Sequence, residues 1–176
     1  VSSKISKEIF KMGACGSEVR LLEGDQYGTN ISCLSGTSQS GGIESLFLAN
    51  VGTEFKDTTP RYVIAIDGII ESIGQLHGIF EATEDEPLLI MAKGFLPDVA
   101  NTLAANYPSH LNCIPFVVSD WFESDFLNLQ KCGITCVSVE SGDIIQNARP
   151  RNKINTYVST QEVVFSGEGT SERLID

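Results

Sequence analysis

The sequence predicts an α/β fold in which a parallel sheet is built from strands joined by helices. Between Tyr62 and Val139, short apolar runs alternate with longer segments of helical period. Apolar runs of about 4–8 residues joined by amphipathic segments of about 10–15 are typical of parallel strands covered by crossover helices. The expected βαβαβαβ order is strand 62–67, helix 68–82, strand 87–92, helix 97–107, strand 111–118, helix 120–133 and strand 134–139.

The first expected helix has apolar residues at spacings of four, three and four, which places them on one face. These are Ile69, Ile73, Leu76 and Phe80. The second helix opens with Pro97, which suits a first helical turn because its missing N–H is not needed there. In the third helix, Asp120 is the expected N-cap, and Gly133 stands where a left-handed C-cap belongs.

The flanking segments predict a small appendage and a closing hairpin. A short helix is expected at 5–12, followed by short strands at 19–22 and 30–34. The glycine- and serine-rich run 36–42 predicts a flexible connection or a domain boundary, and the expected domains are 1–35 and 36–176. Residues 155–159 and 161–165 predict the hairpin.

Composition narrows the classes of partner and compartment. The 12 basic and 23 acidic residues give a net charge of −11, which disfavours nucleic acid as a partner. No apolar stretch approaches the roughly 20 residues of a membrane span, so we expect a soluble protein. The five cysteines are an odd number, which favours a reducing compartment. The start at Val1, without Met or a signal peptide, predicts an excised or processed chain.

Asp67 is the one candidate for chemistry on the sheet itself. It ends the first expected strand, at the edge where open α/β sheets bind ligands, and Lys93 follows the next strand. One hypothesis is therefore a stand-alone sensor or phosphoacceptor domain centred on Asp67. The alternative is that Asp67 caps the following helix. We expect no catalytic residue and no metal site, because no histidine, cysteine or glycine-rich pattern has the required spacing.

Apolar residues outside the expected core suggest a surface that binds another protein. One group precedes the βα unit, and a second stripe runs along the first two helices. The members of this expected surface are Ile43, Phe47, Leu48, His77, Phe80, Ala100, Ala104 and Ala105. The pattern is equally compatible with Phe47 and Phe80 being buried in the core.

The order of these residues resembles the apical domain of group I chaperonins, the GroEL family. The resemblance is carried by 62–95, by the proline-started helix that ends in LAANY, and by the strand, helix and ITCVSV that follow. Segment 41–50 resembles the aromatic segment that opens that domain, and 163–169 resembles its late strand and Gly-x-Gly turn. Residues 5–24 resemble part of the intermediate domain.

The resemblance implies that the apolar surface defined above binds non-native polypeptides and a co-chaperonin. The family has larger aliphatic residues where this chain has His77, Ala100, Ala104 and Ala105, so a shallower groove is expected. A structural alternative, motivated by these alanines, is a domain that only mediates assembly. The resemblance also implies a longer parent chain that forms a ring and binds ATP and Mg²⁺, whereas this fragment has no ATPase. The implied compartment is the bacterial cytoplasm, the mitochondrial matrix or a plastid.

Overall fold

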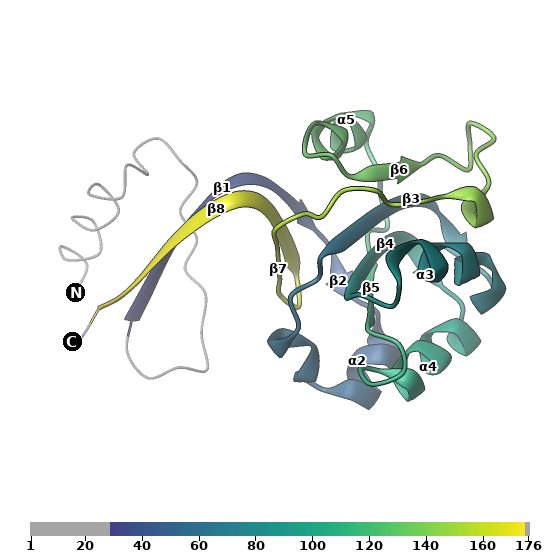
Figure 1. The fold of residues 1–176 in the computed structure, drawn as a ribbon, viewed down its shortest axis with the longest axis horizontal. Coiled ribbons are helices and arrows are strands. Elements are labelled where there is room, and N and C mark those ends of the chain that lie inside the picture. The colour runs from purple at the N-terminus through teal and green to yellow at the C-terminus, as the bar shows by residue number, and fades with distance from the viewer. Residues whose placement is uncertain (1–28, 175–176) are drawn as a thin grey trace. The chain divides into compact units, whose positions relative to one another are not determined.

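The structure is a computed structural model that describes residues 29–174 (Figure 1). The helix expected at 5–12 and the strand expected at 19–22 lie outside the described residues. The described residues divide into two units, one formed by residues 36–166 and the other containing residues 29–35 and 167–174. The candidate site lies wholly in the unit 36–166.

This unit contains a five-stranded sheet with the order β2-β5-β4-β3-β6. The strands β3, β4, β5 and β6 run parallel, and β2 joins the edge antiparallel to β5. The predicted α/β class and its parallel strands are therefore confirmed. The strand bounds are Gly42–Ile43 (β2), Tyr62–Ile70 (β3), Leu88–Phe95 (β4), Cys113–Val117 (β5) and Thr135–Val137 (β6).

The central strands form the core because they are apolar along both faces. Residues 88–92 of β4 are all buried, and so are residues 63–66 of β3. All side chains of a strand that is apolar at every position are removed from water only when helices cover both faces of its sheet. The helical elements are α2 (Ser45–Val51), η1 (Glu54–Asp57), η2 (Ile73–Leu76), α3 (His77–Thr83), α4 (Pro97–Asn106), α5 (Glu123–Lys131) and η3 (Ile145–Asn147).

The strand order decides which helices share a face of the sheet. The connections from β3 to β4 and from β4 to β5 step in one direction across the sheet, and the connection from β5 to β6 steps back. Since parallel crossovers are right-handed, α3 and α4 cover one face and α5 covers the other (Figure 1). The helix α2 packs against α4 and so belongs to the first face.

The boundary between β3 and the first crossover helix differs from the prediction. The strand continues to Ile70, where Ile69 pairs with Gly94 and Ile70 with Phe95 after a register shift. Ile69 is therefore a strand residue with half of its surface exposed, and its assignment to a helical stripe is wrong. The helical segment begins later because Gln75 accepts hydrogen bonds from the N–H groups of Glu71 (2.7 Å) and Ser72 (3.2 Å).

The ends of α4 and α5 test the predicted caps. Pro97 is the first residue of α4, as expected. At the end of α5, Gly133 has a φ of 84°, and the N–H of Ile134 donates to the carbonyl of Leu129 at 3.1 Å. This is the predicted left-handed cap. The prediction of Asp120 as the N-cap is wrong, because α5 starts at Glu123 and it is the Asp125 carboxylate that accepts the Phe122 N–H, at 2.9 Å.

A second sheet has three strands in the order β1-β8-β7, with bounds Thr29–Ser40 (β1), Thr156–Val158 (β7) and Glu162–Leu174 (β8). The antiparallel pairing of β7 with β8 confirms the hairpin predicted near the carboxyl end. Residues 36–40 belong to β1, so a flexible connection over this part of 36–42 is wrong. The pairing continues past the end of β1, where the Gly41 N–H donates to the Gln161 carbonyl at 3.0 Å.

Candidate functional site

The expected binding residues lie on the face of the sheet that carries α2, α3 and α4. We use the name helical layer for the helices α2, α3 and α4 together with β2, the short strand that precedes α2. Ile43 lies in β2, Phe47 and Leu48 in α2, His77 and Phe80 in α3, and Ala100, Ala104 and Ala105 in α4. The fold therefore gathers residues that are up to 62 positions apart in the sequence on one face, from Ile43 to Ala105.

Phe47 is an anchor for α2 and has no surface exposed. The carboxylate of Glu44 accepts the Phe47 N–H at 2.8 Å and so caps the start of α2. The Phe47 ring then meets Tyr107 edge-on, with the ring centroids 5.2 Å apart and the planes at 78°. Tyr107 immediately follows α4, so this aromatic pair holds α2 against α4.

Three of the expected contact residues are buried in the folded domain. Phe47 and Ala100 have 0% of their surface exposed, and Ile43 has 7%. The expectation that these three side chains are open to a polypeptide is wrong, because the docking of α2 on α4 and the pairing of β2 with β5 enclose them. For Phe47, the structure favours the alternative of simple burial in the core.

The other expected residues are accessible to different degrees. Leu48, Phe80 and Ala104 are partly buried and pack against the core. His77 and Ala105 are exposed, and the His77 Nε2 lies 3.6 Å from the Glu81 carboxylate on the same face of α3. Both side chains of this pair are more than 70% exposed, so the contact contributes little to stability.

The structure adds exposed apolar residues that the periodicity missed. At the ends of β3 and β4 lie Ile69 (51% exposed), Ile73 (36%) and Leu96 (43%), which we call the strand-end patch. The Leu96 N–H donates to the Ile70 carbonyl at 3.0 Å, which joins the two chain segments. A signal was present in the sequence, because Ser72-x-x-Gln75 is a capping box that places the helix start after Ile69.

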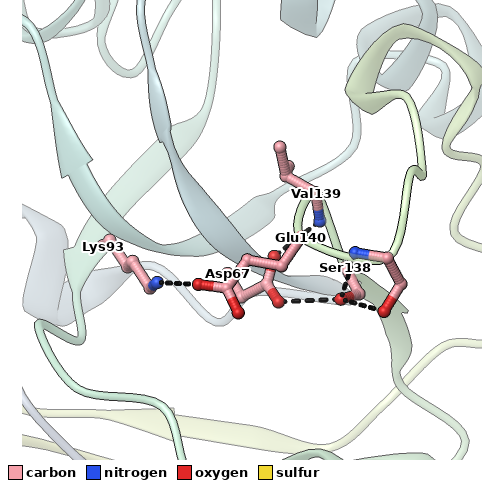
Figure 2. A network of polar contacts seen from close by, with 6 residues as sticks. Asp67, Lys93, Ser138, Val139 and Glu140 are labelled. Carbon is pink, nitrogen blue, oxygen red and sulfur yellow. Dashed lines mark hydrogen bonds and ion pairs between the residues drawn. The ribbon is translucent and has the colours of Figure 1, made fainter.

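Asp67 belongs to β3, next to the neighbouring strand β6. The chain leaves β3 toward β4 on one side and returns to β6 on the other, so the direction of the crossovers reverses between β3 and β6. Figure 2 shows the Asp67 carboxylate facing the segment that follows β6. Oδ2 accepts the Ser138 hydroxyl at 2.8 Å and Oδ1 accepts the Val139 N–H at 2.6 Å. Gly68 allows this approach, because a Cβ there would lie 2.9 Å from the Val139 side chain.

These contacts bear on both hypotheses for Asp67. It lies inside β3 rather than before a helix, so its assignment as a helix cap is wrong. Ligands of open α/β sheets bind at such reversal points, but here the chain's own 138–139 segment occupies both carboxylate oxygens. Lys93 pairs instead with Glu140, at 3.1 Å. The geometry therefore disfavours Asp67 as a phosphoacceptor.

The cysteine thiols of the sheet are not prepared for nucleophilic chemistry. Cys113 is fully buried in β5, and this burial raises the pKa of its thiol far above the ordinary 9.0. Burial also raises the pKa of Cys136 in β6 to about 12. Both groups stay protonated at neutral pH, whereas the reactive form of cysteine is the thiolate.

The pKa of Cys113 predicts a loss of stability in alkaline solution. Above pH 9.0 the unfolded thiol loses its proton while the folded one keeps it, so the folded state binds more protons and the free energy of unfolding falls as pH rises. The limiting slope for one such group is about 1.4 kcal/mol per pH unit. Urea unfolding at pH 8–11 should show a shallower decline for Cys113→Ala than for the wild type. An equal decline with pH for the two proteins would show that the buried Cys113 thiol is not the cause.

Among the side chains that the structure describes, no group of three or more His, Cys, Asp or Glu residues is arranged to hold a metal ion. In the same part of the chain, no helix combines the length and apolarity needed to cross a membrane. No protein-family model matches the chain, and no characterised protein matches it either.

Proposed function

We propose that residues 36–166 form a polypeptide-binding domain of the group I chaperonin type, which captures apolar segments of non-native proteins. In this proposal a co-chaperonin competes for the same surface. The domain acts within a longer parent chain that forms a homo-oligomeric ring and supplies ATP hydrolysis with Mg²⁺, so this part of the chain is not itself an enzyme. These partners follow from the resemblance described above.

The observation that carries the proposal is the accessible apolar surface on the helical layer and at its edge. Single exposed apolar residues are normal, but here several occur on the elements of the helical layer and at the strand ends that lead into it. Leu46 of α2 is 36% exposed, Leu48 and Phe80 are partly accessible, and the strand-end patch lies where α3 and α4 begin. This combination is suited to an extended chain that offers apolar side chains in no fixed order.

The energetics fit weak and unselective binding. Full burial of one large apolar side chain is worth about 1.5–3 kcal/mol, and partly exposed residues recover only a part of this. Several such contacts are needed to offset the ordering of a flexible chain. The small Ala104 and Ala105 contribute little contact area, so we expect larger shares from Phe80 and Leu96.

The residues that we propose to contact a client polypeptide therefore differ from those expected from the sequence. Ile43, Phe47 and Ala100 support the surface from within. The side chains that a client would touch are Leu46, Leu48, His77, Phe80, Ala104 and Ala105, together with the strand-end patch.

Charge substitutions on this face test the proposal. In a titration with a fluorescently labelled, permanently unfolded protein, we expect Leu96→Glu and Phe80→Glu each to weaken binding about tenfold. The physical reason is that a carboxylate replaces apolar surface, and its desolvation on binding is unfavourable. Fluorescence anisotropy gives the Kd.

Leu127→Glu is the matched control. Leu127 is 52% exposed on α5, which covers the other face of the sheet, so this variant carries the same change in charge and should bind as the wild type does. If all three variants bind equally well, the helical layer is not the site. If binding by the wild type is undetectable, the assembly-only alternative is favoured.

A further inference from the structure

A polar pocket opens beside β6, and none of the proposed polypeptide contacts lies in it. Its volume is about 650 Å³, within the range of small-molecule sites. The walls are formed by residues 135–137 of β6, by the loop 142–144, by Asn147 at the end of η3 and by the following segment with Arg149 and Arg151. All of these residues belong to the unit 36–166.

The charge of this pocket differs from that of the chain as a whole. The chain carries a net charge of −11 and has only 12 basic residues. Two of them, Arg149 and Arg151, line the pocket, and among the described lining residues Asp143 alone carries a carboxylate. The guanidinium group has a planar set of donors that matches phosphate and carboxylate oxygens, so two arginines in one pocket favour an anion.

Arg149 is held in a defined position. Its Nη1 donates to the carbonyls of Gln146 at 2.7 Å and Ala148 at 2.8 Å, both at the end of η3. The guanidinium lies directly on α3, because a Cβ on Gly78 would come within 2.6 Å of Nη1. The hydrogen bonds occupy Nη1, and Nη2 also lies against α3, 2.7 Å from the position of that added Cβ. Among the side chains that the structure describes, neither Nε nor Nη2 has a hydrogen-bond acceptor. A group already fixed in place loses less conformational entropy when a ligand binds.

Arg151 and Asp143 complete the electrostatics of the pocket. Arg151 is exposed and makes no hydrogen bond or ion pair with the described part of the chain. Its charge is therefore not neutralised by a neighbour there. The Asp143 carboxylate accepts the Ser138 N–H at 2.9 Å, which fixes it in its loop. Its negative charge opposes an anion in the pocket and so limits the affinity.

We propose that this pocket binds a small anionic molecule, whose phosphate or carboxylate group is held by Arg149 and Arg151. The pocket is separate from the proposed polypeptide contacts, so the proposal does not depend on the chaperonin function. The phosphate and carboxylate sources share the same recognition chemistry, and the experiment distinguishes them.

The test is a titration of the ¹⁵N-labelled full chain with inorganic phosphate and, separately, with acetate at constant ionic strength. We expect saturable amide shifts at Gly142 and Asn147. Tighter binding of phosphate indicates a phosphorylated ligand, and tighter binding of acetate indicates a carboxylate. Arg151→Gln should weaken binding about tenfold, the loss expected for one charge-assisted hydrogen bond.

Two further variants make the result decisive. Asp143→Asn keeps an acceptor for the Ser138 N–H but removes the charge, so it should tighten phosphate binding several-fold. Arg61→Gln removes an exposed arginine outside the pocket and should leave the affinity unchanged. Shifts that do not saturate would overturn the proposal, as would equal losses in Arg61→Gln and Arg151→Gln. The same spectra report whether each variant is folded.

Discussion

Phe47→Ala is expected to lower the free energy of unfolding by about 3–5 kcal/mol, the range for removing a large aromatic side chain from a core. The ring is fully buried and packs edge-on against Tyr107, so its removal leaves a cavity between α2 and the end of α4. Urea unfolding followed by circular dichroism measures the change. The midpoint should fall while the slope stays constant.

Leu46→Ala is the matched control, because Leu46 is the preceding residue of the same helix and is 36% exposed. We expect it to cost about 1–2 kcal/mol, clearly less than Phe47→Ala, since part of the Leu46 side chain stays in contact with water and less apolar surface is lost. This pair of variants separates an anchor from a contact. A Phe47→Ala protein that kept its stability and lost only polypeptide binding would show that the ring is a contact residue, against the structure.

Gly41→Ala is expected to be the second most damaging of these substitutions. A Cβ at this position would lie 2.3 Å from the Val117 carbonyl oxygen and 2.5 Å from the Phe116 ring. Overpacking typically costs about 1–3 kcal/mol, and we expect the upper end because backbone is one of the groups in the way. The strain should separate β2 from β5, and faster hydrogen exchange of the Glu44 N–H, which donates to the Pro115 carbonyl at 3.0 Å, would report it.

Gly42→Ala provides an internal comparison one residue away. The nearest atom to its added Cβ is the Thr160 carbonyl oxygen at 3.8 Å, an ordinary contact. We therefore expect a change of less than about 1 kcal/mol, in either direction. Equal destabilisation by the two substitutions would mean that close packing at Gly41 is not what this glycine provides.

These two glycines also show the limits of interpreting composition. The run 36–42 has the composition of a flexible linker or a domain boundary. In the structure, residues 36–40 are part of β1, and Gly41 lies against the backbone of β5. A glycine required for close approach and a glycine in a linker have the same side chain, so only the neighbouring strand distinguishes them.

The order of the main elements was predictable because it depends on local periodicity. The buried strands β3 to β6 and the helices between them occur in the predicted order, and each overlaps the segment predicted for it, although several ends differ. The error at Ile69 arose at a boundary, where Ile69 and Ile70 suit either a helical stripe or a strand. Long-range pairing with β4 decided in favour of the strand, since it provides backbone partners for these residues.

The candidate site was predictable only in part. The sequence placed Leu48, His77, Phe80, Ala104 and Ala105 on elements that do share one face. It could not show that Phe47 and Ala100 are buried. An apolar residue on a helix has the same local sequence pattern whether it is covered by a second helix or exposed to solvent. The docking of α2 on α4 is a contact between distant segments, and it decided the burial of Phe47.

By itself, the sequence determined the α/β class, the parallel strands, and the left-handed cap at Gly133, since each depends on residues close together in the chain. Only the tertiary structure decided which apolar side chains face water, that Asp67 is satisfied by the segment after β6, and that Arg149 and Arg151 line one pocket. The physical reason is that burial and pocket formation are properties of contacts between elements, and a one-dimensional pattern specifies those contacts only indirectly.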